Sequence, residues 1–352
     1  MTTATRRDRR EFLRLLSGVG LGFSCGGVGS VGRALAWEEP TLINADTEAA
    51  IERGLRWLAG RQNEDGSLGS GNYARNTGVV GIAGLAFLAQ GSSPRQGPWS
   101  ANLLRAHEFL FAETQGNGLI SKQQQSRGPM YEHAFATLLL AESLGTWNHP
   151  ALRPTLSRAV DLIVASQNDE GGWRYQPRRD DADVSVTAAQ VMALRAARNG
   201  GIFVPDQCVA NAVDYLKRSQ NEDGGFLYMG EERESAFPRS AAAIVALFNA
   251  GVSDGQAIEN GLSYLADSLP NSEELVGPLP SHFFYGHYYA VQAMWHAGPE
   301  RFAKWYVAIR DLLLERQLDE GQWEDQLAGE YATAMALIIL QVPNNLLPIL
   351  QR

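Results

Sequence analysis

The segment SQNDEGGWRY, Ser166–Tyr175, recurs along the chain at nearly constant intervals. Related segments are RQNEDGSLG at Gln62, TQGNGLIS at Gln115, SQNEDGGFLY at Gln220 and RQLDEGQWED at Gln317. Successive glutamines lie 53, 52, 53 and 97 residues apart, and the last interval contains a degenerate copy near Leu269. Equal spacing is the signature of a repeat protein, and it predicts six units of about fifty residues.

Each unit is predicted to contain two helices. Before the glutamine, apolar residues recur every three or four positions, as in TLSRAVDLIVAS (155–166), which indicates an amphipathic helix. After the loop, segments such as YEHAFATLLLAESLG (131–145) are apolar on all sides, which indicates a buried helix. Glycine ends the first helix because it tolerates left-handed backbone angles. We therefore expect an all-α fold, an (α/α)6 toroid of six helix-pair repeats around a central cavity.

The first 36 residues are predicted to be a signal peptide. Arg9-Arg10-Glu11-Phe12-Leu13-Arg14 resembles the twin-arginine export motif, a weakly apolar run covers residues 15–31, and small residues end at Ala36. The run is too short and too rich in glycine to span a bilayer. We expect residues 37–352 to form one exported domain, periplasmic or associated with the cell envelope, with no transmembrane segment in the mature chain.

The net charge argues against two classes of partner, and the cysteine content argues against an internal disulfide. The 352-residue chain has a formal charge of −9, and removal of the signal peptide would leave 24 basic and 37 acidic residues, a charge of −13. An acidic body argues against nucleic acid and against anionic membrane surfaces. Only Cys208 would remain in the mature chain, so no internal disulfide can form.

The repeated loops carry a family resemblance. Gln167–Trp173 and Gln317–Trp323 resemble the QW repeats of squalene and oxidosqualene cyclases. Gln220–Phe226 is similar to the corresponding loop of protein prenyltransferase β subunits. The resemblance covers residues 45–342, and it implies an (α/α)6 toroid with a largely apolar cavity. The loops themselves are predicted to stabilise helix ends, because glutamine bonds exposed backbone groups and Trp or Phe seals the junction.

The catalytic motifs of that superfamily are not intact. The resemblance implies Asp-x-Asp-Asp before Thr-Ala in protonating cyclases, and the register of Thr187-Ala188 gives Asp183-Val184-Ser185-Val186. Only the first aspartate is present, and Ser185 occupies the proton donor's position. The zinc site of the prenyltransferases implies Asp-x-Cys on the helix that begins at Phe237, which has neither residue. Unaltered cyclisation and unaltered prenyl transfer are therefore disfavoured.

Polar and aromatic residues at the starts of the inner helices are predicted to form a rim around the cavity. The candidates are Tyr131, Glu132, His133, Asp183, Ser185, Glu234, Tyr285, His287, Tyr288 and Tyr331. Among them, Glu132, His133, Asp183 and His287 offer oxygen and nitrogen ligands for a divalent metal, or a general acid–base set. Helix capping is the alternative role for each residue taken alone.

A polar rim above an apolar cavity is the usual form of a ligand site. The sequence thus predicts a protein that binds a small apolar ligand, a lipid or isoprenoid, or a peptide. The alternative is an enzyme that uses the rim acids and histidines. It would be a lyase or hydrolase, with or without a divalent metal as cofactor, or a divergent isoprenoid-processing enzyme. The segment Gly277–Gly286 is interpreted either as a lid or as a stiff connection.

Overall fold

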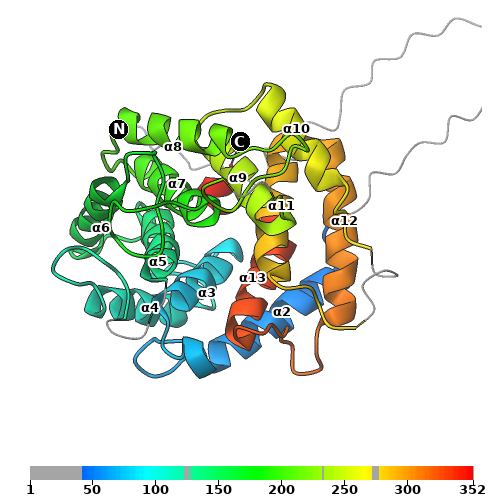
Figure 1. The fold of residues 1–352 in the computed structure, drawn as a ribbon. Coiled ribbons are helices and arrows are strands. Elements are labelled where there is room, and N and C mark those ends of the chain that lie inside the picture. Colours follow the sequence, from blue (N-terminus) through cyan, green and yellow to red (C-terminus); the bar gives the residue numbers. More distant parts are fainter. Residues whose placement is uncertain (1–41, 123–125, 127, 232–233, 272–276, 352) are drawn as a thin grey trace, which may run out of the picture. The chain divides into compact units, whose positions relative to one another are not determined.

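Twelve α-helices alternate between an outer and an inner ring in the computed structural model, which describes residues 42–351 apart from 123–125, 127, 232–233 and 272–276 (Figure 1). The outer helices are α2 (Ala45–Gly60), α4 (Ser100–Ala112), α6 (Leu152–Ser166), α8 (Asp206–Arg218), α10 (Gln256–Ala266) and α12 (Pro299–Arg316). The inner helices are α3 (Thr77–Ala89), α5 (Pro129–Ser143), α7 (Val184–Asn199), α9 (Phe237–Asn249), α11 (Phe283–Ala297) and α13 (Gly329–Gln341). Three short 3₁₀ turns are η1 (Gly71–Tyr73), η2 (Val342–Asn344) and η3 (Pro348–Leu350).

The inner helices form a closed ring. Each packs against the next along the chain, and the last inner helix, α13, packs against the first, α3. The described residues contain isolated β-bridges but no strand. The predicted all-α toroid is therefore confirmed, and residues Pro40–Arg352 form one compact unit. The predicted signal peptide lies outside the described residues, so export through the twin-arginine pathway stays a prediction.

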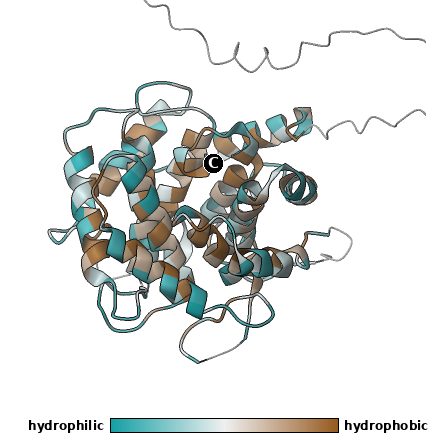
Figure 2. Ribbon diagram, turned by 90° about the horizontal axis from the view of Figure 1, so that it is seen from above, coloured by the Kyte–Doolittle hydropathy of each residue, from teal (hydrophilic) through white to brown (hydrophobic). Residues whose placement is uncertain are grey.

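Composition explains which helices lie inside. Every residue of α3 is buried, whereas α2 buries only one face. Connecting loops are mostly hydrophilic, and the hydrophobic stretches run along the helices (Figure 2). Small residues let the inner helices approach closely: a Cβ atom added at Gly81 would lie 2.6 Å from the backbone of Phe135 on α5. None of the described helices is long and apolar enough to cross a membrane.

The repeated glutamine joins neighbouring units. The Nε2 group of Gln167 donates to the carbonyl oxygen of Gly171 in its own loop and to that of Cys208 on α8, both at 2.9 Å. Gln62 and Gln220 make the equivalent two bonds, one within their own loop and one to the next outer helix. Gln317 donates to Gly321 and to Ala50 on α2, both at 2.8 Å, and so connects the last loop to the first outer helix.

The loop tryptophans attach each outer helix to the following inner helix. The indole Nε1 of Trp173 donates to the carbonyl of Ile163 on α6 at 2.7 Å, and the backbone N–H of Trp173 donates to Thr187 Oγ1 on α7 at 3.0 Å. Trp323 repeats both bonds with Leu313 and Thr333. The loops therefore have the stabilising role that the sequence predicts.

One end of the ring is covered by the segment after α13. Near that end of α5, the carboxylate of Glu142 accepts a hydrogen bond from the backbone N–H of Ile349 at 3.1 Å. The indole of Trp295, near the end of α11, donates to the Leu350 carbonyl at 2.7 Å, and η3 packs against α7. Burial raises the pKa of Glu142 to about 7. The opposite end, where the inner helices begin, carries the predicted rim.

Candidate functional site in the inner ring

Aromatic side chains meet across the axis of the inner ring. Helices α5 and α11 lie on opposite sides of this ring, three positions apart in its order. The ring centroids of Tyr131 and Tyr285 are 6.4 Å apart, and those of Phe135 and Tyr288 are 6.1 Å apart, in edge-to-face geometry. The centre of the toroid is thus lined and crossed by aromatic rings in two successive layers.

Exposure falls from the rim toward the interior. Tyr131, Tyr285 and Tyr331 are half-buried, whereas Tyr288 and Tyr289 retain 2% and 0% of their surface. Burial raises the pKa of the Tyr131 and Tyr285 hydroxyls well above the ordinary value, so both stay neutral donors. The Tyr285 hydroxyl donates to the Ser185 carbonyl at 3.3 Å. The layer nearest the helix N-termini is therefore the accessible side of the aromatic centre.

Asp183 begins α7 and is fully buried. Its Oδ1 accepts from the backbone N–H of Val186 at 2.8 Å, the arrangement of an N-cap. Its Oδ2 has no hydrogen-bond partner among the described residues. Burial raises the pKa of Asp183 to about 6, although the N-cap bond and the nearby Arg174 favour the charged form. One oxygen of this carboxylate thus caps the helix, and the other oxygen accepts no hydrogen bond from the described residues.

Three residues that the sequence did not single out surround Asp183. The Arg174 guanidinium forms an ion pair with Asp181 and lies over the rings of Tyr175 and Tyr228, at 5.1 and 5.8 Å from their centroids. The two tyrosine hydroxyls are 2.5 Å apart. A small pocket of about 180 Å³ opens beside Arg174 and Tyr175. Tyr175 and Tyr228 both follow the loop aromatic by two positions, which was the available sequence signal.

Glu132 has a structural role. Its carboxylate is buried and accepts hydrogen bonds from Asn76 Nδ2 at 3.0 Å, Thr77 Oγ1 at 3.1 Å and Ser121 Oγ at 2.8 Å. These bonds fasten the start of α3 and the loop between α4 and α5 to α5. A carboxylate with three donors is satisfied without a ligand.

The two candidate histidines are also buried within the fold, one by hydrogen bonds to the backbone and the other among aromatic rings. His133 Nδ1 accepts from the Ile120 N–H at 3.0 Å, and its Nε2 lies 3.1 Å from the Ala159 carbonyl. His287 is enclosed by the rings of Phe237, Phe283 and Trp305, with centroids 4.4 to 5.8 Å away. Burial lowers the pKa to about 4 for His133 and to about 3 for His287, so both are neutral.

The structure does not bring the four predicted metal ligands together. Glu132, His133, Asp183 and His287 each face different neighbours, and no group of three His, Cys, Asp or Glu side chains in the described part of the chain could hold a metal ion. Glu234 is exposed in the loop before α9, away from the axis. Residues that neighbour each other at the starts of helices thus contact different elements of the fold.

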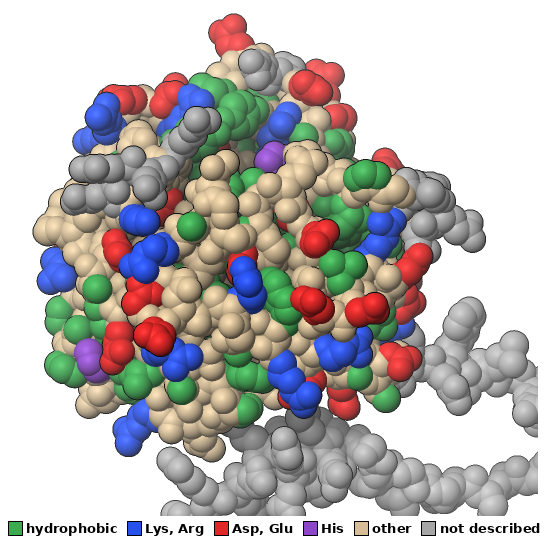
Figure 3. All heavy atoms as spheres, turned by 90° about the horizontal axis from the view of Figure 1, so that it is seen from below, with side chains coloured by type: hydrophobic (Ala, Val, Ile, Leu, Met, Phe, Trp, Pro, Cys, Tyr) green, Lys and Arg blue, Asp and Glu red, His purple; other side chains and the backbone are tan. Residues whose placement is uncertain are grey.

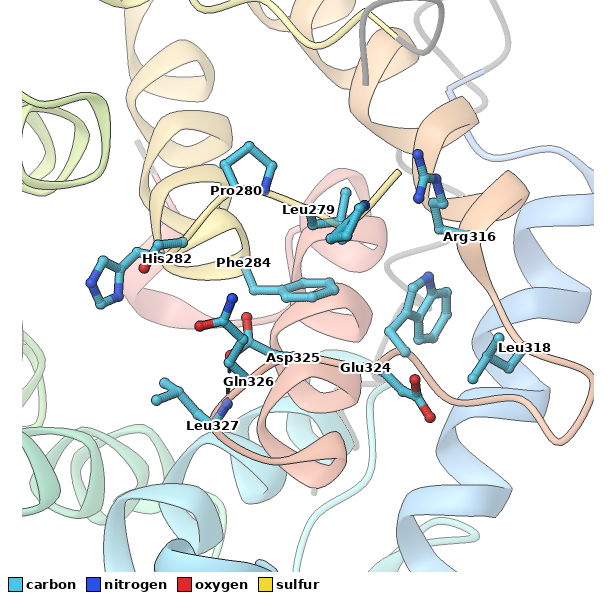
Figure 4. Close-up of a pocket in the computed structure, with 13 residues that line it drawn as sticks. Leu279, Pro280, His282, Phe284, Arg316, Leu318, Glu324, Asp325, Gln326 and Leu327 are labelled. Atoms are coloured by element: carbon cyan, nitrogen blue, oxygen red, sulfur yellow. Dashed lines mark hydrogen bonds between the residues drawn. The ribbon is translucent and has the colours of Figure 1, made fainter. Parts of the chain in front are cut away.

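A pocket larger than the one beside Arg174 lies between the segment before α11 and the last loop. It has a volume of about 470 Å³ and is walled by Pro278–His282 on one side and Glu324–Leu327 on the other (Figure 4). Arg316 donates to the Gly277 carbonyl at 2.8 Å and fixes the start of this wall. None of the ten predicted rim residues lines the pocket. The segment Pro278–His282 thus forms one wall of this pocket, opposite the last loop.

Comparisons with known proteins agree with this architecture. A family model of the squalene-hopene cyclase C-terminal domain matches residues 136–274. Drimenyl diphosphate synthase of Streptantibioticus cattleyicolor is 28% identical over 183 residues, 51% of this chain and 32% of that protein. Squalene–hopene cyclase of Bradyrhizobium diazoefficiens is 26% identical over 219 residues, 54% of this chain and 32% of that protein. The chain spans about a third of the length of the curated relatives that it matches.

Solved structures share the fold. The type II terpene cyclase MstE from Scytonema has a TM-score of 0.61 at 16% identity, covering 88% of this chain and all of its own. The α-1,6-mannanase GH76A of Salegentibacter sp. HEL1_6 has a TM-score of 0.59 at 10% identity, covering 85% and 99%. Such identities show the fold alone, and the fold hosts unrelated chemistries. The repeat period, the cyclase-domain match over residues 136–274 and the closed α/α ring together support the predicted resemblance to the terpenoid cyclase superfamily.

Proposed function

We propose that this protein binds a small apolar ligand of the isoprenoid class in the aromatic centre of its inner ring, without protonating it. The observation that carries the proposal is the pair of aromatic layers in which α5 and α11 meet across the axis, Tyr131 with Tyr285 and Phe135 with Tyr288. Because these rings contact each other across the axis, a ligand that enters from the rim must separate the half-buried tyrosines first and the buried layer next.

Physical chemistry favours a lipid over a peptide in this position. Each buried methylene group contributes about 0.8 kcal/mol, whereas each backbone N–H and C=O of a peptide needs a hydrogen-bond partner. The buried layer offers mainly ring faces and the thioether of Met192, which lies 3.6 Å from the Tyr288 hydroxyl. The Scytonema cyclase has been solved with geranylgeranyl dihydroxybenzoate and with merosterolic acid A, which supports an isoprenoid ligand by analogy of fold.

The catalytic alternative has less support. Ser185 stands in the proton donor's position of the cyclase motif, and a serine hydroxyl is far too weak an acid to protonate an alkene. Asp183 uses one oxygen as an N-cap, and Glu132 accepts three hydrogen bonds within the fold. Binding in the exported, mature chain, after loss of the predicted twin-arginine signal peptide, is the function that we propose.

The experiment is a titration of the purified chain with farnesol, followed by quenching of intrinsic tyrosine and tryptophan fluorescence. We expect saturable binding. The variant Tyr131→Arg keeps a long side chain at the half-buried rim but puts a charge on the path of the ligand. We expect binding at least about ten-fold weaker, because the bound apolar ligand would remove water from the charged guanidinium.

Phe203→Arg is the matched control, because Phe203 is 82% exposed in the connection after α7, at the other end of this helix. Far-ultraviolet circular dichroism checks that both variants are folded. Absence of saturable binding, or equal affinities of the Tyr131→Arg variant and the native chain, would contradict the proposal.

A further inference from the structure

Two buried polar atoms beside the aromatic centre lack hydrogen-bond partners among the described residues. They are Oδ2 of Asp183, an acceptor, and Nε of Arg174, a donor. The two atoms form an ion pair at 3.8 Å, a separation that is too long for a direct hydrogen bond. Buried polar groups are almost always paired, so an unpaired donor next to an unpaired acceptor needs an explanation.

Both atoms are held in place by other contacts. The second oxygen of Asp183 is fixed by the Val186 N–H at 2.8 Å, and the backbone N–H of Asp183 donates to the Trp173 carbonyl at 3.0 Å. The Arg174 guanidinium is held by Asp181 and by the rings beneath it. Neither side chain can close the gap without losing these contacts.

On the basis of the proposed function, we infer that the apolar ligand carries a hydroxyl group, which sits between these two atoms. The hydroxyl donates its hydrogen to Asp183 Oδ2 and accepts from Arg174 Nε. An oxygen about 2.8 Å from each atom fits a separation of 3.8 Å. A hydroxyl both donates and accepts, which a hydrocarbon, an ether or a phosphate dianion does not. The ligand class is therefore an isoprenoid alcohol.

Charge at the rim disfavours a diphosphate head group. Three guanidinium groups of the loops already have carboxylate partners: Arg174 pairs with Asp181, Arg179 with Asp169, and Arg61 with Glu330 at the start of α13. Acidic and basic side chains are interspersed rather than gathered by sign on the face in Figure 3. A diphosphate would also lie against the carboxylate of Asp183, and like charges repel.

The test compares farnesol with farnesyl methyl ether, by fluorescence titration at pH 8. The ether accepts hydrogen bonds but donates none, so the native chain should bind it at least ten-fold more weakly than farnesol. The variant Asp183→Asn keeps the N-cap through its amide oxygen and places an N–H donor where Oδ2 was. In this variant we expect the difference between alcohol and ether to fall below two-fold or to invert.

The extra bulk of the ether's methyl group affects binding to both proteins alike. Its effect therefore cancels when the alcohol-to-ether preference of the native chain is compared with that of Asp183→Asn. Arg174→Met is a second variant, which should weaken farnesol binding several-fold by removing the donor while keeping the chain length. Asp206→Asn is the control, because Asp206 forms an exposed pair with Arg198 at the far end of α7, 2.9 Å from it. This substitution should leave both affinities unchanged.

The outcomes separate the two levels of the claim. Equal binding of alcohol and ether by the native chain would overturn the hydroxyl site, with a trapped water as the occupant of the gap, and would leave the proposed function intact. Binding of neither compound would overturn both. A ten-fold preference that survives unchanged in Asp183→Asn and Arg174→Met would also refute the assignment of these two residues.

Discussion

Replacing Gln317 by alanine should destabilise the fold at the point where the ring closes. The substitution removes the two Nε2 hydrogen bonds of 2.8 Å and leaves the carbonyl oxygens of Ala50 and Gly321 without this donor; it also removes the exposed hydrogen bond that Arg53 donates to Oε1. A typical hydrogen bond contributes about 1 kcal/mol net, and a buried group left unpaired costs about 1–3 kcal/mol. Because the site is only partly buried, we expect the free energy of unfolding to fall by about 2 kcal/mol.

Urea denaturation followed by circular dichroism at 222 nm measures this change, with an unchanged m-value as the sign that the native fold persists. Gln167→Ala should cost at least as much, because the same two bonds are more deeply buried there. Gln351→Ala, at an exposed site, is the control and should shift stability by less than about 0.5 kcal/mol. A loss for Gln167→Ala with none for Gln317→Ala would mean that the ring is not closed in solution.

Three further changes test the packing of the loops and the buried titratable groups. A Cβ at Gly171 would lie 2.2 Å from the Asn211 carbonyl at a φ of +96°, so Gly171→Ala should cost more than about 3 kcal/mol in urea denaturation, whereas Gly145→Ala, with φ +101° and open space, should cost about 1 kcal/mol. The pKa of Asp183 is raised to about 6 from 3.8, so the native chain should lose about 3 kcal/mol of stability relative to Asp183→Asn as the pH rises from 4 to 7. The same pH dependence in both proteins would refute this. The pKa of His133 is lowered to about 4 from 6.5, so the sign is opposite: the native chain should lose about 3 kcal/mol relative to His133→Gln as the pH falls from 6.5 to 4, measured in the same way.

The fold was predictable because the residues that connect neighbouring units lie close together in the sequence, within each repeated loop. In the loops at Gln167, Gln220 and Gln317, the positive-φ glycine follows the glutamine by four positions and the aromatic residue follows it by six. The glutamine of each of these loops bonds to the next outer helix in the same way. Closure was predictable from the apolar last helix, since α13 needs a partner on both sides and finds one in α3. Repetition thus turns a weak local pattern into a constraint on the whole ring.

The site was less predictable because the inner helices are apolar all round. Periodicity then gives no information about which side of a helix faces the axis. Glu132 and His133 are adjacent, yet the first binds the start of α3 and the second contacts α6. The sequence predicts one rim for Asp183, Tyr131 and Tyr285 but does not indicate Arg174, whose placement depends on a pair of tyrosines from two different repeats.

A crystal structure of the chain with a brominated farnesol analogue would test the binding proposal most directly. Bromine at the end of the chain far from the hydroxyl gives an anomalous signal that locates the ligand without reference to the side chains. The proposal predicts a single peak in the aromatic centre, below Tyr131 and Tyr285 and near Phe135. A peak in the 470 Å³ pocket behind Pro278–His282, or no peak in an otherwise well-ordered complex, would contradict it.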